Sequence, residues 1–153
     1  MPTLTLLAPF TGRVVPIEQV PDPVFAQKIV GDGLAIDPGE GVGVAPVSGE
    51  LAVFVSGGHA FAMRAAGLEI IVHAGLDTVK MEGKGFEKLA EVGDQVTAGQ
   101  LIVRFDLAAI RAAGYSTLSP VVISNLPESA QLTKAAPNSQ VRAGIDPLLT
   151  VEL

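Results

Sequence analysis

The sequence predicts an all-β fold, an antiparallel β-sandwich or barrel with few short helices. Seventeen glycines and eleven prolines recur at short intervals along its 153 residues. Between them lie short runs rich in Val, Ile, Leu and Phe, a pattern typical of strands joined by tight turns. Helical patterns are rare and do not alternate with the apolar runs, so βαβ units are not expected.

Each expected strand is one of these apolar runs, bounded by glycine, proline or a polar residue that favours a turn. In chain order the runs are 5–10, 12–17, 33–38, 43–48, 49–55, 60–65, 68–74, 100–106, 120–125 and 148–153.

Three short segments carry helical signals. In 106–114, Asp106 is a candidate N-cap and Gly114 a candidate C′ residue, with apolar residues between them. Residues 24–29 fit one helical turn, and 128–136 fit a further short helix.

An internal repeat accompanies the strand pattern. The motif Ala-Pro-x-x-Gly followed by an apolar strand occurs in 6–17 and again in 43–54. The motif Val-x-Ala-Gly followed by an apolar strand occurs in 96–105 and again in 141–151. The repeat is either a chance recurrence of common turn chemistry or a duplicated β-unit whose two halves pack their apolar faces together.

Composition limits the classes of protein to consider. The length predicts one domain over residues 1–153, long enough to bury about 70% of the surface of the unfolded chain. The absence of cysteine excludes disulfides and thiolate metal sites and fits a reducing, cytoplasmic compartment. A net charge of −6 argues against nucleic-acid binding.

The mean hydropathy of +0.46 raises the question of a membrane segment. No apolar run reaches the roughly 18 residues that a spanning helix needs. The first ten residues lack a basic region and contain Pro9, so a secretory signal is not expected.

Both histidines lie in one glycine-rich apolar segment, 57–79. If 65–67 is the turn of a hairpin, His59 and His73 pair directly across two strands on the same face, with Cβ atoms about 5 Å apart. The same register pairs Phe61 with Ile71 and Met63 with Glu69.

Two adjacent imidazoles in apolar surroundings resist protonation, because burial and like charge both lower their pKa values. A neutral imidazole is a nucleophile and a metal ligand, so the pair suits phosphoryl acceptance or a Zn²⁺ ion at His59 and His73, although no third His or Cys completes a common zinc site. A carbonyl at Gly75 could bind Nδ1–H of His73, and Asp77 could orient a ring or cap a turn. The alternative is that both are ordinary hydrogen-bonded histidines.

Seven segments of the chain occur in a characteristic order: 20–36, 45–54, 59–61, 73–79, 83–86, 105–107 and 120–125. Together they resemble the glucose-type enzyme IIA family of the bacterial phosphoenolpyruvate-dependent sugar phosphotransferase system. The resemblance covers roughly residues 4–153 and implies an antiparallel β-sandwich with a duplicated hybrid motif. It also implies a cytoplasmic phosphocarrier without a cofactor, which accepts a phosphoryl group from phospho-HPr and passes it to the sugar-specific IIB domain of a membrane permease.

The resemblance assigns roles to individual residues. His73 corresponds to the histidine phosphorylated on Nε2, and His59 to its partner, which stabilises the phosphoryl group. Gly75 would accept the Nδ1–H bond through its carbonyl, and Asp22 and Asp77 border the site. The apolar ring that docks partner proteins corresponds to Val24, Phe25, Ile29, Val30 and Val79.

Two positions depart from the family pattern. Gly57 stands where the family usually has a threonine, with Ser56 one residue earlier, so that hydroxyl is either supplied by Ser56 or lost. Pro23 stands where an aliphatic residue is common.

Other functions compete with the phosphocarrier. A lysostaphin-type zinc endopeptidase requires a third ligand, and a lipoyl or biotinyl carrier requires a lysine in a hairpin turn, for which Lys80 is the nearest candidate. A regulatory role in binding transporters or kinases is compatible with the phosphocarrier. The sugar is set by the membrane partner.

Overall fold

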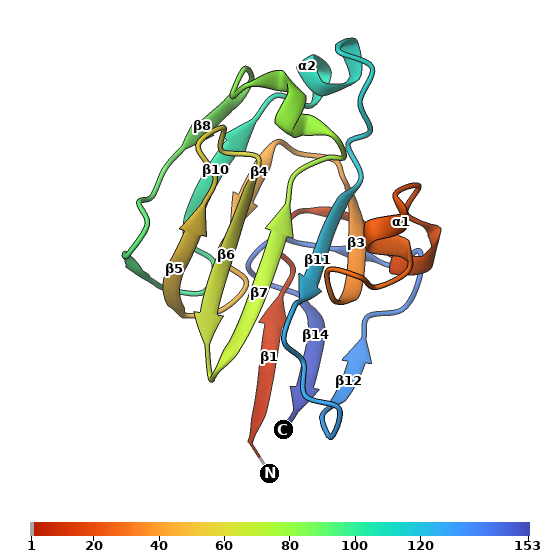
Figure 1. The fold of residues 1–153 in the computed structure, drawn as a ribbon, viewed down its shortest axis with the longest axis vertical. Helices are drawn as coiled ribbons and strands as arrows, with labels where there is room; N and C mark the ends of the chain where they lie inside the picture. Colours follow the sequence, from red (N-terminus) through yellow and green to blue (C-terminus); the bar gives the residue numbers. More distant parts are fainter. Residues whose placement is uncertain (1) are drawn as a thin grey trace.

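Three antiparallel sheets make up most of the structure, a computed structural model that describes residues 2–153 (Figure 1). The largest has the order β13-β2-β3-β11-β7-β6-β5-β9, and two three-stranded sheets have the orders β1-β14-β12 and β4-β10-β8. The predicted all-β class is therefore confirmed. The strands are β1 (Thr3–Leu7), β2 (Gly12–Pro16), β3 (Asp32–Pro38), β4 (Val42–Val44), β5 (Gly49–Phe54), β6 (Ala60–Ala65), β7 (Leu68–His73), β8 (Phe86–Lys88), β9 (Gln95–Val96), β10 (Leu101–Phe105), β11 (Ser119–Ile123), β12 (Gln131–Lys134), β13 (Gln140–Val141) and β14 (Pro147–Glu152).

The main core lies on one face of the large sheet. In β7, Leu68, Ile70 and Val72 are at most 2% exposed, while the alternate residues are only partly buried. This alternation is expected of a strand with one face in the core. His73 follows the outer register, so its side chain starts on the face opposite the main core.

A second, smaller core lies on the outer face of the same sheet. It supports the segment between β2 and β3 together with the loop after β7, the two parts of the chain that surround His73. Its buried members are Val15, Ile17, Val20, Phe25, Ala35, Leu76 and Val122.

Backbone hydrogen bonds confirm that the sequence repeat is a structural duplication. Gly144 N–H donates to Ala8 O at 2.9 Å, and its counterpart Gly99 N–H donates to Ala45 O at 2.8 Å. The two Ala-Pro segments also bond each other reciprocally. Leu7 N–H donates to Pro46 O at 2.8 Å, and Val44 N–H donates to Pro9 O at 2.9 Å.

Helices are few and short. They are η1 (Ile17–Gln19), α1 (Pro23–Ala26), η2 (Thr78–Met81) and α2 (Leu107–Ala112). Asp106 caps α2 as predicted, since its side chain accepts from Ala109 N–H, and α1 is the predicted turn. None of these helices has the length and hydropathy needed to cross a bilayer within residues 2–153.

The helix predicted over 128–136 is wrong, because that segment contains β12, which pairs with β14. The pairing with β14 and the packing of Leu132 against the main core outweigh the local helix propensity of this segment.

The predicted register of the β6–β7 hairpin is also wrong. Ala65 pairs with Leu68, so the turn has two residues, Ala66 and Gly67, with φ of 51° and 76°. Two positive φ values are typical of a type I′ turn, whose twist matches the right-handed twist of the flanking strands. His73 therefore pairs with Ala60 and not with His59.

The duplicated turns generate a stability prediction. Gly144 has φ +71°, and a Cβ there would lie 3.0 Å from Cα of Gly99. Gly144→Ala should lower the free energy of unfolding by about 2–3 kcal/mol, since it adds a backbone clash to the cost of about 1–2 kcal/mol for a left-handed residue. Gly93→Ala is the control, because Gly93 has φ +95° and open space around it. Urea unfolding of both variants should show the larger loss for Gly144→Ala, and equal losses would contradict the close contact.

Candidate functional site

The two histidine rings lie beside each other at one end of the large sheet. Their centroids are 5.2 Å apart with an interplanar angle of 69°. His73 is the last residue of β7, and His59 precedes the first residue of the neighbouring strand β6 (Figure 1). Because His59 stands outside β6, strand alternation does not fix its side chain on one face. The rings thus meet although the predicted cross-strand pair does not form.

His73 is held by the loop that follows it. Its Nδ1 lies 2.6 Å from the carbonyl oxygen of Gly75. A carbonyl can only accept, so Nδ1 carries the hydrogen and Nε2 keeps its lone pair. Gly75 has φ +80°, and a Cβ there would lie 2.6 Å from Cγ2 of Thr78. This position therefore requires glycine.

Aromatic side chains flank both rings. Phe25 contacts His73 edge-on at a centroid distance of 5.5 Å, and Phe86 lies 6.4 Å from His59. Phe86 in turn stacks on Phe105 at 6.0 Å. Sequence reasoning gave no role to Phe86, although it is the last residue of the segment 83–86 that contributes to the family resemblance.

Burial and charge set the protonation of the pair. The pKa of His59 is lowered from 6.5, first by burial and then by the charge of His73. The pKa of His73 is also lowered, because burial outweighs the bond to Gly75 and the charges of Asp22 and Asp77, which act in the opposite direction. Both rings are therefore neutral at pH 7, as a nucleophile requires.

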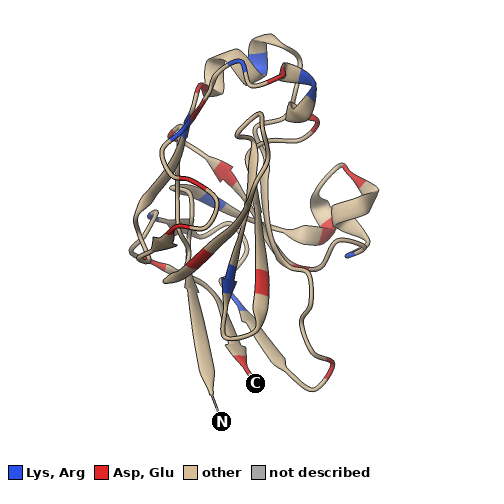
Figure 2. Cartoon of the chain, turned by 60° about the vertical axis from the view of Figure 1, so that its left-hand side comes forward, with Lys and Arg blue, Asp and Glu red and all other residues tan. Residues whose placement is uncertain are grey.

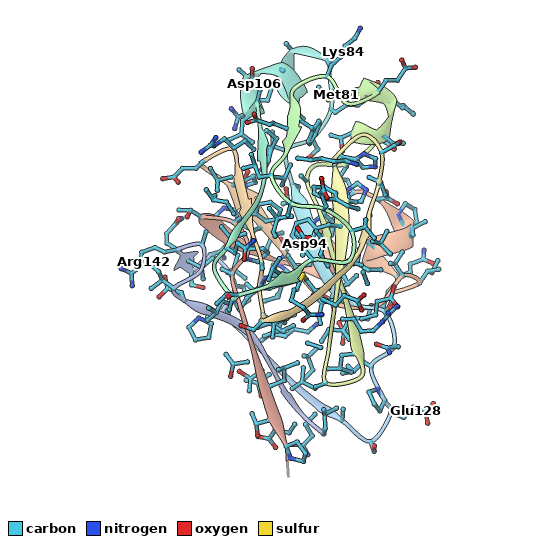
Figure 3. All side chains as sticks on the ribbon, turned by 90° about the vertical axis from the view of Figure 1, so that its left-hand side faces the viewer. Met81, Lys84, Asp94, Asp106, Glu128 and Arg142 are labelled. Carbon is cyan, nitrogen blue, oxygen red and sulfur yellow. The ribbon has the colours of Figure 1, made fainter. Side chains whose placement is uncertain are left out.

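A hollow of about 410 Å³ opens beside His59, lined by Val55, Ser56, Gly57, His59, Val79 and Glu82. A Cβ at Gly57 would lie 3.3 Å from Nδ1 of His59, so the position where the family carries threonine does face this ring. A larger hollow of about 810 Å³ lies near the start of α2, and neither histidine lines it. Asp106, which lines this larger hollow, appears with Met81 and Lys84 at the same end of the molecule in Figure 3.

The predicted docking residues fall into two groups. Val24, Ile29 and Val79 are 43%, 68% and 59% exposed, and Val79 lines the hollow beside His59. Phe25 is only 7% exposed, and Val30 is partly buried against the second core. Phe25 therefore supports the ring of His73 from within and presents little surface to a partner.

The two predicted aspartates lie at the starts of the two short helices nearest His73. Asp22 caps α1, and its side chain accepts from Val24 N–H at 3.1 Å. Asp77 occupies the N-cap position of η2 with φ 60° but makes no side-chain capping bond. Figure 2 shows acidic and basic residues intermingled over the molecule in that view.

Ion pairs tie down the docking segment, defined here as residues 22–30. Lys28 bridges Glu18, at 3.4 Å, and Asp32, at 3.7 Å. Lys134 of β12 holds the same Asp32 oxygen at 2.7 Å. Burial opposes ionisation of Asp32, but the bond to Lys134 and the charges of Lys134 and Lys28 outweigh it, so its pKa is lowered from 3.8.

The two competing functions are not supported. Across residues 2–153, no three His, Cys, Asp or Glu side chains come together as metal ligands, whereas the zinc endopeptidase needs a third. Lys80 lies in η2 and not in the hairpin turn that a lipoyl or biotinyl carrier uses.

Known proteins match the chain in sequence and in structure. Residues 4–129 match the family described as phosphoenolpyruvate-dependent sugar phosphotransferase system, EIIA 1. The chain is 52% identical over 122 residues to the PTS system glucose-specific EIIA component of Bacillus cereus, covering 79% of this chain and 74% of that protein. It is 42% identical over 149 residues to the component of the same name from Halalkalibacterium halodurans, covering 97% and 86%. The structure of glucose permease IIA from Mycoplasma capricolum superposes with a TM-score of 0.91 at 34% identity, covering 98% of this chain and 96% of that one.

The ion pairs of the docking segment predict a local effect of Asp32→Asn. Because the carboxylate is ionised at all pH values above its lowered pKa, the substitution removes an attraction that is present at pH 7. The amide of Ile29, which donates to Val24 O, should exchange with solvent about fivefold faster, corresponding to about 1 kcal/mol. Asp37→Asn is the control, since Asp37 lies on the same strand and its ion pair is with the exposed Arg13. Unchanged exchange at Ile29 in Asp32→Asn would refute the tethering.

The pKa shifts predict how the histidines titrate. Titration followed by ¹H–¹⁵N NMR should place both pKa values below 6.5 in the folded protein. Because the unfolded chain then takes up protons first, the free energy of unfolding should fall as the pH drops below about 6.5 and be insensitive to these groups above it. In His73→Gln, the pKa of His59 should rise but stay below its ordinary value, since burial is the larger cause. A pKa above 6.5 for either ring would contradict the site.

Proposed function

Because the chain belongs to the EIIA 1 family of the phosphoenolpyruvate-dependent sugar phosphotransferase system, we propose that His73 is the residue that carries its phosphoryl group. The family makes the chain a phosphocarrier. The observation that supports His73 as the carrier is the 2.6 Å bond from its Nδ1 to Gly75, which leaves Nε2 with a free lone pair beside a second neutral imidazole.

The transfer is a displacement at phosphorus. The Nε2 lone pair of His73 forms the new N–P bond while the N–P bond to the donor's imidazole breaks, and its electron pair returns to the donor nitrogen. The Nδ1–H group stays hydrogen-bonded to the Gly75 carbonyl, and this hydrogen bond stabilises the positive charge that the ring gains. Phosphoryl transfer depends mainly on positioning and electrostatics, so this chain need supply no metal or cofactor for the step.

His59 stabilises the phosphoryl group by donating a ring N–H to one of its oxygens. Its ring lies 5.2 Å from that of His73, close enough for the group to contact both. Asp22 and Asp77 favour a positive ring on His73, since both raise its pKa. Their negative charge also repels the phosphoryl oxygens, which keeps the group transferable.

Partner proteins dock on the apolar rim formed by Val24, Ile29 and Val79, whose exposure supports this role. An apolar patch with a polar surround is typical of a transient interface. We infer that the donor is phospho-HPr and the acceptor a IIB domain, both met in the cytoplasm. The relatives are named glucose-specific, so glucose is the first sugar to test.

A reconstituted relay tests the assignment. With phosphoenolpyruvate, enzyme I and HPr, the wild-type chain should acquire an acid-labile, base-stable phosphate that maps to His73. His73→Ala should acquire none, because the nucleophile is gone. His59→Gln should accept the group but pass it to a IIB domain at least about tenfold more slowly, since an amide can donate a hydrogen bond but cannot take up a proton and its positive charge as an imidazole can.

Circular dichroism controls for folding of both variants. Phosphate on a serine, or normal uptake by folded His73→Ala, would overturn the proposal. Equal forward transfer by His59→Gln would remove only the role given to His59.

A further inference from the structure

The loop after β7 is held by two hydroxyl groups that the transfer step itself does not use. Both hydroxyl groups are hydrogen-bonded to the peptide unit between Ala74 and Gly75. The carbonyl oxygen of Ala74 accepts from Thr78 Oγ1 at 2.7 Å. The N–H of Gly75 donates to Ser119 Oγ at 3.1 Å. This peptide plane is therefore fixed at both ends.

The next peptide unit is the one that touches His73. Its carbonyl, from Gly75, accepts from Nδ1 of His73, and its N–H, from Leu76, donates to Ser116 O at 3.0 Å. Hydrogen bonds at the two ends of one peptide group polarise each other and strengthen. The orientation of this carbonyl depends on the preceding peptide plane, because Gly75 is the single residue between the two planes. Glycine rotates easily about its backbone bonds, so the carbonyl keeps its direction only when the preceding plane is fixed.

The two hydroxyls are inaccessible to water. Thr78 and Ser119 are both 0% exposed. Ser119 Oγ donates its single proton to Thr117 O at 2.8 Å, so it can only accept from Gly75. Removing either hydroxyl leaves a buried backbone group without a partner, which the loop can relieve only by moving.

We propose that Thr78 and Ser119 are positioning residues for phosphoryl transfer, which hold the Gly75 carbonyl against His73 and thereby select its Nδ1–H tautomer. When the carbonyl moves away, a fraction of the molecules takes up the other tautomer, whose Nε2 carries the hydrogen and has no lone pair to attack phosphorus. The catalytic consequence rests on the proposed role of His73, whereas the tautomer is a property of the unphosphorylated protein.

The test compares variants matched in shape. Thr78→Val removes the hydroxyl and keeps the shape, while Thr78→Ser keeps the hydroxyl. Ser119→Ala removes the other hydroxyl, and Thr117→Val is a control on a buried neighbour whose side chain is not bonded to the loop. Ring ¹⁵N shifts of His73 should report mainly Nδ1–H in the wild type, Thr78→Ser and Thr117→Val, and a tautomer mixture in Thr78→Val and Ser119→Ala.

The rate of phosphoryl uptake from phospho-HPr should fall about tenfold or more in Thr78→Val and Ser119→Ala with KM unchanged, because second contacts of this kind typically contribute such factors and the docking rim is untouched. In the wild type, the Gly75 amide should exchange at least about a hundredfold more slowly than in an unstructured peptide. An unprotected Gly75 amide, or an unchanged tautomer in a folded variant, would overturn the positioning role. An equal fall in the rate of phosphoryl uptake in Thr78→Ser and Thr78→Val would also overturn the positioning role.

The two proposals fail separately. If the wild type takes no phosphate on His73 but its tautomer shifts in the variants as stated, the loop holds the ring as proposed and the relay role of His73 is wrong.

Discussion

The site depends on one hydrogen bond, the 2.6 Å contact between Nδ1 of His73 and the carbonyl of Gly75. It fixes which nitrogen of the ring is nucleophilic, and it also determines the residue at position 75, because the carbonyl reaches back only when φ is positive and no side chain intervenes. The second core, through Leu76 and Val122, anchors the loop that presents this carbonyl. A single backbone conformation thus joins the packing of the outer sheet face to the chemistry of the ring.

The histidine pair combines opposing influences. Burial beside Phe25 and Phe86 keeps both rings neutral, which a nucleophile needs, while the charges of Asp22 and Asp77 favour a positive ring on His73, the form that the proposed transfer would create. Neither influence alone would suit a carrier that must both accept and release the group. A strongly apolar site would resist the charged product, and a strongly acidic one would protonate the rings beforehand.

Sequence reasoning predicted the all-β class, the duplicated unit, the α2 cap and the approach of the two histidines. It failed where tertiary pairing decides the outcome: the register of β6 and β7 depends on a two-residue turn at Ala66, and β12 is a strand because β14 lies beside it. The support for the loop could not be predicted, because Ser119 is forty-four residues from Gly75 and a lone serine before a proline carries no distinctive pattern. The exposure of individual docking residues could not be predicted either, since no pattern in 24–30 distinguishes the buried Phe25 from the exposed Ile29.

The interleaving of the two repeats affects how the chain folds during and after its synthesis. β1 pairs with β14, residue 3 against residue 152, and the reciprocal bonds of Leu7 and Val44 join the two repeats. Closing a loop between residues this far apart in the chain costs conformational entropy, so the chain should fold slowly for its size. It should complete its fold only after β14 has been synthesised. During that interval β1 is an unpaired apolar edge, and a nascent chain depends on chaperones or on rapid completion to avoid aggregation.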